Sequence, residues 1–213
     1  MKIEILSLGI LISAIFAIIF RQRDNIKMYS VFKPLTTILI ISIAIIAYFR
    51  FSSNYTTMII VSLVFSLIGD ILLINKKYFL YGLSSFLLAY IGFTIAFSSL
   101  YGFHWNIIPL VILVLITGSY FIYLRKDLHK YSIPVAIYMT VIIIMNWQAI
   151  GLIFSNMSIV FFGIAIASLL FTFSDSLIAY NKFKRSFKIA EILILSTYWM
   201  SIYLFAIAGL YLD

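Results

Sequence analysis

Eight long runs of apolar residues, separated by short polar segments, dominate the pattern of this 213-residue chain. Each run is close to the ~20 residues that an α-helix needs to cross the ~30 Å hydrocarbon core of a membrane. The runs predict helices at residues 3–20, 33–49, 57–74, 79–99, 107–124, 133–154, 158–180 and 189–210. We therefore expect one all-α domain over residues 1–213, a polytopic bundle of eight transmembrane helices with short loops.

The three prolines fit these boundaries. Pro34, Pro109 and Pro134 each fall in the first turn of a predicted span, where a missing N–H costs little. Pro34 and Pro134 open the second and sixth spans, and Asp70 and Asp175 lie near the ends of the third and seventh. These matches suggest a parallel repeat of four helices plus four.

Positive charge alternates between the predicted loops. Thirteen of the fifteen Lys and Arg residues lie in four alternate segments, namely Arg21, Arg23, Lys27 and Lys33; Lys76 and Lys77; Arg125, Lys126 and Lys130; and Lys182, Lys184, Arg185 and Lys188. By the positive-inside rule, these segments face the cytoplasm. We expect a multi-pass protein of the cell (inner) membrane with both termini on the non-cytoplasmic side.

The composition excludes several classes of protein. A chain that is 64% hydrophobic and 10% charged is not a soluble globule, which averages about a quarter charged residues. The net charge of +8 is explained by loops facing anionic lipid, so we expect no nucleic-acid partner. Cysteine is absent, and His104 and His129 fall on opposite sides of the membrane, so no metal site is predicted.

Ionisable groups inside a span are costly and are therefore candidates for function. Asp70, Asp175 and Glu191 are the acids in question. Asp70 and Asp175 precede the predicted ends of their spans by four and five residues, about 6–8 Å at the helical rise of about 1.5 Å per residue. Both spans run toward the cytoplasm in this topology, so the two carboxyl groups are expected at the same depth.

Each aspartate continues a polar stripe with helical spacing. The stripes are Ser62, Ser66 and Asp70 on one helix, and Ser168, Thr172 and Asp175 on the other. We expect both to face the interior of the bundle, because lipid offers hydroxyl and carboxyl groups no partners. The remaining polar residues expected at this depth are Lys33, Asn75, Tyr138, Ser174, Ser176, Asn181 and Glu191. Together they predict a cavity open to the cytoplasmic leaflet that contains two acids and at least one lysine.

A structural alternative exists for each charged group. Asp70 can pair with Lys76 or Lys77, and Asp175 with Lys182, as anchors at the membrane interface. Lys33 suits an interfacial anchor and a ligand for an anionic group equally well. Glu191 lies within one turn of the boundary, which favours an interfacial role.

Several motifs resemble the YhhN-type lysoplasmalogenase family. They are Lys33-Pro34-Leu35-Thr36, Ser66-Leu67-Ile68-Gly69-Asp70-Ile71-Leu72-Leu73, Gly82-Leu83, Phe86-Leu87-Leu88-Ala89, Tyr138 with Met145, the stretch from Ser168 to Ala179 around Ser174-Asp175-Ser176, and Thr197-Tyr198. They follow the expected order over the second to eighth spans.

This resemblance implies an eight-helix membrane hydrolase. Its substrate would be a lysoplasmalogen, a membrane lipid whose vinyl-ether bond is cleaved to give a fatty aldehyde and glycerophospho-ethanolamine or -choline. The family's two essential aspartates correspond to Asp70 and Asp175, and its basic residue to Lys33. Two positions depart from the family pattern: Tyr90 replaces a usual histidine, and Ile202 replaces a usual glutamine. Tyrosine can donate a hydrogen bond but is a poor base. Isoleucine can neither donate a hydrogen bond nor act as a base.

Two carboxyl groups suit this reaction. Vinyl-ether hydrolysis begins with delivery of a proton to the β-carbon, and it continues with addition of water to the resulting oxocarbenium ion. A poorly solvated pair of carboxyl groups can hold one proton and stabilise one cation, as in glycosidases. Neither metal nor organic cofactor is required. Lys33 is a candidate to hold the phosphate, and Ser66, Asn75, Tyr138, Ser174, Ser176 and Asn181 are candidates to contact the substrate.

Two rival functions are compatible with the same residues. In a proton-coupled transporter the aspartates would bind and release protons, although such a site is expected near the middle of the membrane. The changes at Tyr90 and Ile202 are compatible with a non-catalytic lipid-binding protein. Aldehyde release from lysoplasmalogen separates the enzyme from both. The sequence leaves the oligomeric state open.

Overall fold

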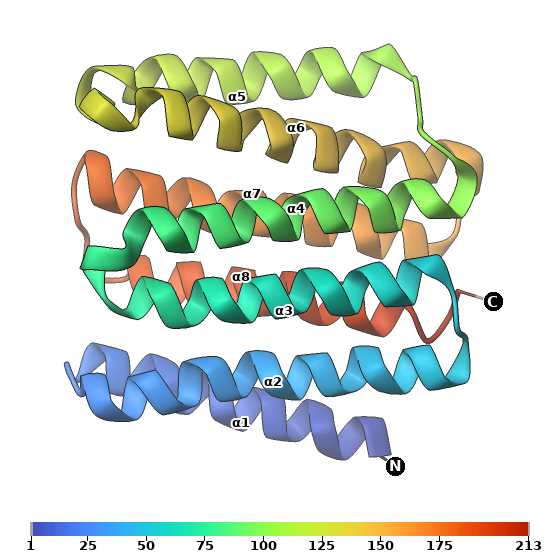
Figure 1. The fold of residues 1–213 in the computed structure, drawn as a ribbon, viewed down its shortest axis with the longest axis horizontal. Helices are drawn as coiled ribbons and strands as arrows, with labels where there is room; N and C mark the ends of the chain where they lie inside the picture. The colour runs from blue at the N-terminus through green and yellow to red at the C-terminus, as the bar shows by residue number, and fades with distance from the viewer. Residues whose placement is uncertain (1, 213) are drawn as a thin grey trace.

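The computed structural model describes residues 2–212 as a set of α-helices packed side by side (Figure 1). The elements within these residues are α1 (Lys2–Gln22), α2 (Ile26–Arg50), α3 (Asn54–Ile74), the 3₁₀ turn η1 (Lys76–Tyr78), α4 (Phe79–Tyr101), α5 (Ile107–Leu128), the 3₁₀ turn η2 (His129–Tyr131), α6 (Ser132–Ser155), α7 (Ile159–Phe183) and α8 (Ala190–Ala208). None of residues 2–212 lies in a β-strand. The predicted all-α class is therefore confirmed.

Most of these helices suit the interior of a lipid bilayer. Seven stretches of the described chain are long and apolar enough to cross a membrane. One of them, Ile107–Ser155, contains both α5 and α6, joined by η2. The protein is a multi-pass membrane protein, while the count of eight crossings stays a prediction.

Polar residues at the ends of the apolar runs determine where several helices begin. The Ser53 hydroxyl accepts a hydrogen bond from the Thr56 backbone N–H, and the Thr56 side chain accepts one from the Ser53 backbone N–H, so the two form a capping box before α3. The Ser158 side chain accepts a hydrogen bond from the Phe161 backbone N–H at the start of α7, and the Asn106 side chain accepts one from the Ile108 N–H at the start of α5. These side chains satisfy backbone N–H groups that the first turn of a helix leaves without partners.

The predicted start of the second span is wrong. The side chain of Asn25 accepts a hydrogen bond from the Met28 backbone N–H, so α2 begins at Ile26 rather than at residue 33. Pro34 consequently lies inside α2 and not in its first turn. Lys33 is displaced with it, to about 10 Å from the start of the helix at the usual rise per residue.

The other two prolines lie where the sequence predicted them. Pro109 is in the first turn of α5, and Pro134 is in the first turn of α6. Proline is accommodated there because the first backbone N–H groups of a helix have no partner within it.

The helices lie alongside one another in the order that Figure 1 shows. α3 packs along α4 and α7 along α8, while α2 contacts both α3 and α8. α6 contacts α4 and α7, and α5 packs mainly against α6 at one side of the molecule. Buried positions that converge on a site can therefore come from α2, α3 and α8 together, or from α4, α6 and α7 together.

α3 and α4 approach each other closely because of small residues. A Cβ placed on Gly69 would lie 2.6 Å from the Phe86 ring, and a Cβ on Gly92 would collide with the Ser62 hydroxyl. Glycine at these two positions therefore permits the close packing of α3 against α4.

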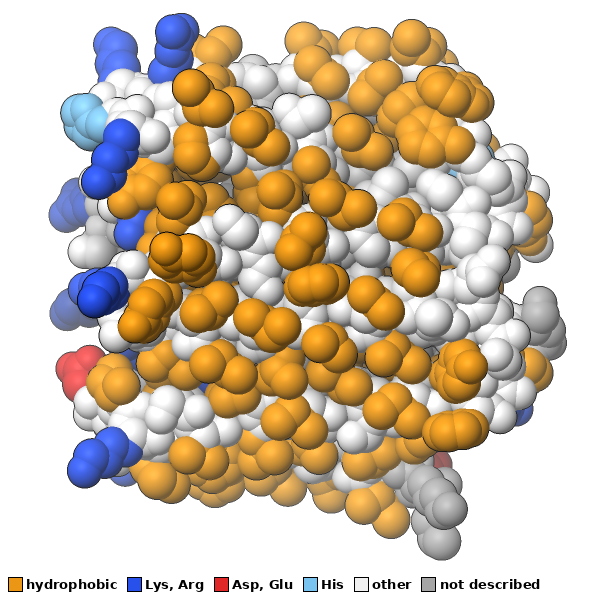
Figure 2. All heavy atoms as spheres, in the orientation of Figure 1, with side chains coloured by type: hydrophobic (Ala, Val, Ile, Leu, Met, Phe, Trp, Pro, Cys, Tyr) orange, Lys and Arg blue, Asp and Glu red, His pale blue; other side chains and the backbone are white. Residues whose placement is uncertain are grey.

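Lys and Arg side chains gather along one edge of the molecule, at the left of Figure 2. The connections α1–α2, α3–α4, α5–α6 and α7–α8 all lie at this end, and both chain ends are marked at the other (Figure 1). We refer to the edge formed by these four connections as the basic end. The four connections that carry most of the Lys and Arg residues in the sequence therefore lie together, as the alternation of charge predicted.

Aromatic side chains fill the middle of the bundle. Phe93 and Phe97 from α4 pack against Phe205 from α8, and Phe93 also contacts Phe171 from α7. All four are fully buried, with 0% of their surface exposed. These rings form the apolar centre in which α4, α7 and α8 meet.

Candidate active site

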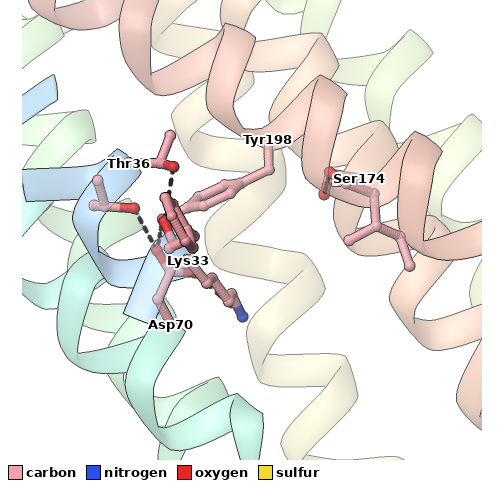
Figure 3. A network of polar contacts seen from close by, with 8 residues as sticks. Lys33, Thr36, Asp70, Ser174 and Tyr198 are labelled. Atoms are coloured by element: carbon pink, nitrogen blue, oxygen red, sulfur yellow. Dashed lines mark hydrogen bonds and ion pairs between the residues drawn. The ribbon is translucent and has the colours of Figure 1, made fainter. Parts of the chain in front are cut away.

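The carboxyl group of Asp70 lies in a fully enclosed polar cluster between α2, α3 and α8. Its Oδ2 accepts hydrogen bonds from the Thr37 hydroxyl at 2.6 Å and the Tyr198 hydroxyl at 2.8 Å. Its Oδ1 lies 3.4 Å from the Lys33 ammonium nitrogen. Figure 3 shows the Tyr198 side chain reaching from α8 toward Asp70, with Ser174 apart from this cluster.

Helical spacing explains how this cluster forms. Lys33 and Thr37 are four residues apart on α2, so both face α3. Asp70 belongs to the stripe with Ser62 and Ser66, and all three are buried, which confirms the inward orientation of that stripe. A charge enclosed so completely is tolerated when it is both paired and hydrogen-bonded, as Asp70 is.

The carboxyl group of Asp175 is held by two tyrosines from different helices. Tyr90 on α4 donates its hydroxyl hydrogen to Asp175 Oδ2 at 2.6 Å, and Tyr138 on α6 donates to the same oxygen. The two tyrosine rings meet edge to face at 5.5 Å between centroids. No described residue hydrogen-bonds to the other carboxyl oxygen, Oδ1, so one side of Asp175 is held and the other is free to interact.

A cavity of about 260 Å³ opens beside Asp175 between α4, α5, α6 and α7. Tyr138, Thr172 and Ser176 contribute polar groups to its wall together with Asp175. The rest of the wall is mostly apolar and includes Leu73, Phe79, Leu83, Phe86, Ile116, Val135, Met139, Ile142, Ile178, Ala179 and Phe183. An apolar cavity with a few convergent polar groups is the usual form of a site for a lipid-like ligand.

The structure corrects the expectation that both aspartates share one cavity. The cavity reaches Asp175, whereas Asp70 is 1% exposed and absent from the wall. An aromatic layer lies between them: Tyr198, which binds Asp70, packs against Phe171 at 5.2 Å, and Phe171 packs against Tyr90 at 4.7 Å. The two carboxyl groups therefore belong to adjacent clusters joined by aromatic rings.

The two aspartates also lie at different distances from the ends of their helices, contrary to the expected equal depth. α7 continues to Phe183, three residues beyond the predicted end, so Asp175 lies eight residues, about 12 Å, from its end. Asp70 lies four residues, about 6 Å, from the end of α3. The polar residues Asn181 and Lys182 suggested the end of a hydrophobic run, but they remain helical.

The other predicted site residues separate into two groups. Ser176 and Tyr138 line the cavity, whereas Ser66 and Ser174 are buried elsewhere. The Ser174 hydroxyl donates to the Ile194 carbonyl, and the Ser66 hydroxyl has no partner among the described residues.

Two predicted residues lie at the basic end, Asn75 in the turn before η1 and Asn181 in the last turn of α7. Asn75 is exposed and caps η1 by accepting a hydrogen bond from the Lys77 backbone N–H. Asn181 accepts a hydrogen bond from the Phe187 backbone N–H in the connection to α8. Both side chains therefore organise backbone turns in this structure.

The interfacial-anchor alternative is wrong for both aspartates. Asp70 pairs with Lys33 rather than with Lys76 or Lys77, and Asp175 is bound by tyrosines rather than by Lys182. Glu191 forms an ion pair of 2.8 Å with Arg21, the basic residue in the last turn of α1. No group of three His, Asp or Glu side chains among the described residues could hold a metal ion.

The family model for YhhN matches residues 28–209, which cover most of the chain. The chain belongs to the YhhN family. YhhN is the lysoplasmalogenase family, so the resemblance that the motifs indicated is confirmed. No curated protein and no solved structure matches the chain.

Within this YhhN protein, one of the two positions expected to depart from the family pattern has a clear structural role. Tyr90 binds Asp175, so the sequence difference falls directly on the site. The other departure, Ile202, is fully buried in the apolar core. Sequence reasoning did not identify Thr37 as a ligand of Asp70, although its spacing of four residues from Lys33 was a usable signal. It noted Tyr198 only as part of a family motif.

Proposed function

We propose that this protein is a membrane-embedded hydrolase that cleaves the vinyl-ether bond of lysoplasmalogens. The products are a fatty aldehyde and glycerophospho-ethanolamine or -choline. Membership of the YhhN family supports the substrate class. The observation that carries the proposal is the carboxyl group of Asp175, held by Tyr90 and Tyr138 at the wall of an apolar cavity.

In the proposed reaction, Asp175 supplies the first proton. The proton leaves Oδ1, the oxygen without a described partner, and bonds to the β-carbon of the vinyl ether. The carbon–carbon double bond is consumed, and the ether oxygen shares its electrons with the adjacent carbon as an oxocarbenium ion. Tyr90 and Tyr138 donate hydrogen bonds to Oδ2, and these stabilise the carboxylate that the transfer creates.

The carboxylate then takes part in the second half of the reaction. A water molecule adds to the oxocarbenium carbon while Asp175 accepts its proton, giving a hemiacetal. The hemiacetal hydroxyl loses its proton as its oxygen forms the carbonyl double bond, and the bond between the hemiacetal carbon and the glycerol oxygen breaks. The glycerol oxygen takes the bonding electron pair and one proton, so this step consumes no net proton, and the aldehyde is released. Asp175 is protonated at the start and the end of each cycle, so one carboxyl group acts as acid and as base.

Asp70 supports this site from outside the cavity. Its hydrogen bond fixes Tyr198, whose ring packs edge to face on Phe86 at 5.7 Å between centroids, and Phe86 forms part of the cavity wall. In this account Asp70 and Lys33 position the wall, and they act on the reaction through Tyr198 and Phe86.

The proposed topology has eight crossings of the cell membrane, with the basic end in the cytoplasm and both termini outside. The charge at the basic end supports this orientation. The chain has no cysteine, so single cysteines can be introduced in place of Lys130 and Asn106. In intact cells, an impermeant thiol reagent should label the cysteine at 106 and spare that at 130. The reverse pattern would overturn the orientation.

The activity is tested with purified protein, lysoplasmalogen and an ester-linked lysophospholipid of the same chain length. In D₂O we expect fatty aldehyde with one deuterium on the carbon next to the carbonyl, because the proton is delivered there. The ester-linked lipid should give no product. Proton-coupled flux in proteoliposomes would identify a carrier instead of a hydrolase. Lipid binding without aldehyde release would identify a lipid-binding protein.

A further inference from the structure

A lysine lies at the basic end of the cavity, and nothing in the proposed reaction uses it. The ammonium nitrogen of Lys182 lies 3.7 Å from the centroid of the Phe79 ring. Phe79 and the neighbouring Phe183 are both part of the cavity wall. A positive charge is therefore held against the rings that form this part of the wall.

A second lysine lies close to the first. Lys76 begins the η1 turn that leads directly into Phe79, the residue whose ring Lys182 covers, so both lysines belong to the same corner of the basic end. Neither forms an ion pair with a described carboxylate, whereas Lys33, Arg21 and Lys184 pair with Asp70, Glu191 and Asp127. Two neighbouring cations without a counter-charge favour the binding of an anion between them.

The position of Lys182 relative to Asp175 fits the shape of a lysophospholipid. The two residues are seven positions apart on α7, two turns of helix, so they share a face and lie about 10 Å apart along the axis. In a lysophospholipid the glycerol backbone separates the ether oxygen from the phosphate, and the alkyl chain extends in the opposite direction. With the ether at Asp175, the phosphate would extend toward Lys182, and the alkyl chain would extend toward Ile116 and Ile142 in the cavity wall.

The lysine that the sequence suggested for the phosphate is engaged elsewhere. Lys33 is 6% exposed, lies 3.4 Å from the Asp70 carboxylate and does not line the cavity. Its ring contact is with Tyr29, at 5.9 Å, rather than with a residue of the cavity wall. Binding phosphate at Lys33 would require the buried ion pair to open.

We propose that Lys182, assisted by Lys76, binds the phosphate group of the lysophospholipid and so sets the depth at which its ether bond meets Asp175. This inference rests on the proposed function for the identity of the lipid. It assigns the polar end of the substrate to the connection between α3 and α4 and the end of α7.

The test compares two ligands that cannot be hydrolysed. One is a saturated 1-O-alkyl glycerophosphocholine, and the other is the 1-O-alkyl glycerol of the same chain length, which lacks the phosphate. Binding to purified protein in detergent is measured by native mass spectrometry. Replacing Lys182 by Gln should weaken binding of the phosphate-containing lipid about tenfold, the effect of losing one charged hydrogen bond. Binding of the alkyl glycerol should stay unchanged.

Two further variants and a third ligand complete the comparison. Lys182→Arg should retain most of the affinity, because it keeps the charge and the contact with Phe79. Lys126→Gln, an exposed lysine in the last turn of α5, should behave as wild type. Inorganic phosphate should bind far more weakly than the lipid, because it gains nothing from the apolar cavity.

Three results would overturn the proposal. They are equal weakening of both lipids by Lys182→Gln, no weakening of either, and binding of inorganic phosphate as tight as that of the lipid. Because these measurements need no turnover, they separate this inference from the proposed reaction. Absence of aldehyde release together with the expected binding pattern would reject the hydrolase and keep the phosphate site.

Discussion

The Tyr90 hydroxyl lies 2.6 Å from Asp175 Oδ2 and donates a hydrogen bond to it. This contact joins α4 to α7 at the wall of the cavity. The family resemblance implies a histidine at this position, and a histidine ring could donate to the same oxygen. Tyr90 therefore serves as a hydrogen-bond donor to the carboxylate without acting as a base.

Replacing Tyr90 by Phe removes this donor and keeps the ring that packs on Phe171. We expect kcat for aldehyde release to fall about tenfold, the usual effect of losing one hydrogen bond to a charged group. Tyr90→His should restore part of the rate. Tyr203→Phe is the matched control, because the Tyr203 hydroxyl forms its hydrogen bond with Ser7 of α1, away from the cavity. Equal rates for Tyr90→Phe and wild type would remove Tyr90 from the mechanism.

Phe86 connects the two aspartate clusters, and Gly69 allows it to occupy its position. A Cβ on residue 69 would lie 2.6 Å from the Phe86 ring, so Gly69→Ala should displace that ring from the cavity wall. We expect a stability loss of about 1–3 kcal/mol from overpacking, together with reduced aldehyde release. Gly163→Ala, where the added Cβ meets open space, serves as the control. Full activity in Gly69→Ala would show that the position of this ring does not matter.

Several features of this site follow from the sequence alone. The spacing of Ser62, Ser66 and Asp70 on one helix indicated an inward face, and the buried state of all three agrees. The positions of the basic residues indicated which helix ends lie together. The first inference depends only on the spacing of residues along one helix, and the second only on the positions of charged residues. Both can be read directly from the sequence.

The partners of the aspartates did not follow from the sequence. Asp70 is bound by Tyr198, and Asp175 by Tyr90, from helices distant in the chain. Hydropathy identifies spans but not which spans are neighbours, so it does not predict these pairs. Lys33 was misplaced for a local reason: the Asn25 cap starts α2 earlier than its apolar run.

The buried pair of Lys33 and Asp70 gives a stability prediction. Lys33→Met leaves a carboxylate enclosed without its cation, which should destabilise the protein by about 3–5 kcal/mol. Replacing both residues, as Lys33→Met with Asp70→Leu, should recover much of that loss. Unfolding by SDS titration of the purified proteins measures both values, with Lys126→Met as the surface control. If Lys33→Met alone is as stable as wild type, the ion pair is not a structural element.

The central claim is that the carboxyl group of Asp175 performs the chemistry inside the cavity. Asp175→Asn keeps the size of the side chain and its place beside Tyr90 and Tyr138, but it removes the acidic proton. The decisive measurement is aldehyde release from lysoplasmalogen by this variant and by wild type, with binding of the saturated ether lipid measured in parallel. We predict that the variant binds the lipid and releases no aldehyde. Aldehyde release at the wild-type rate would contradict the account.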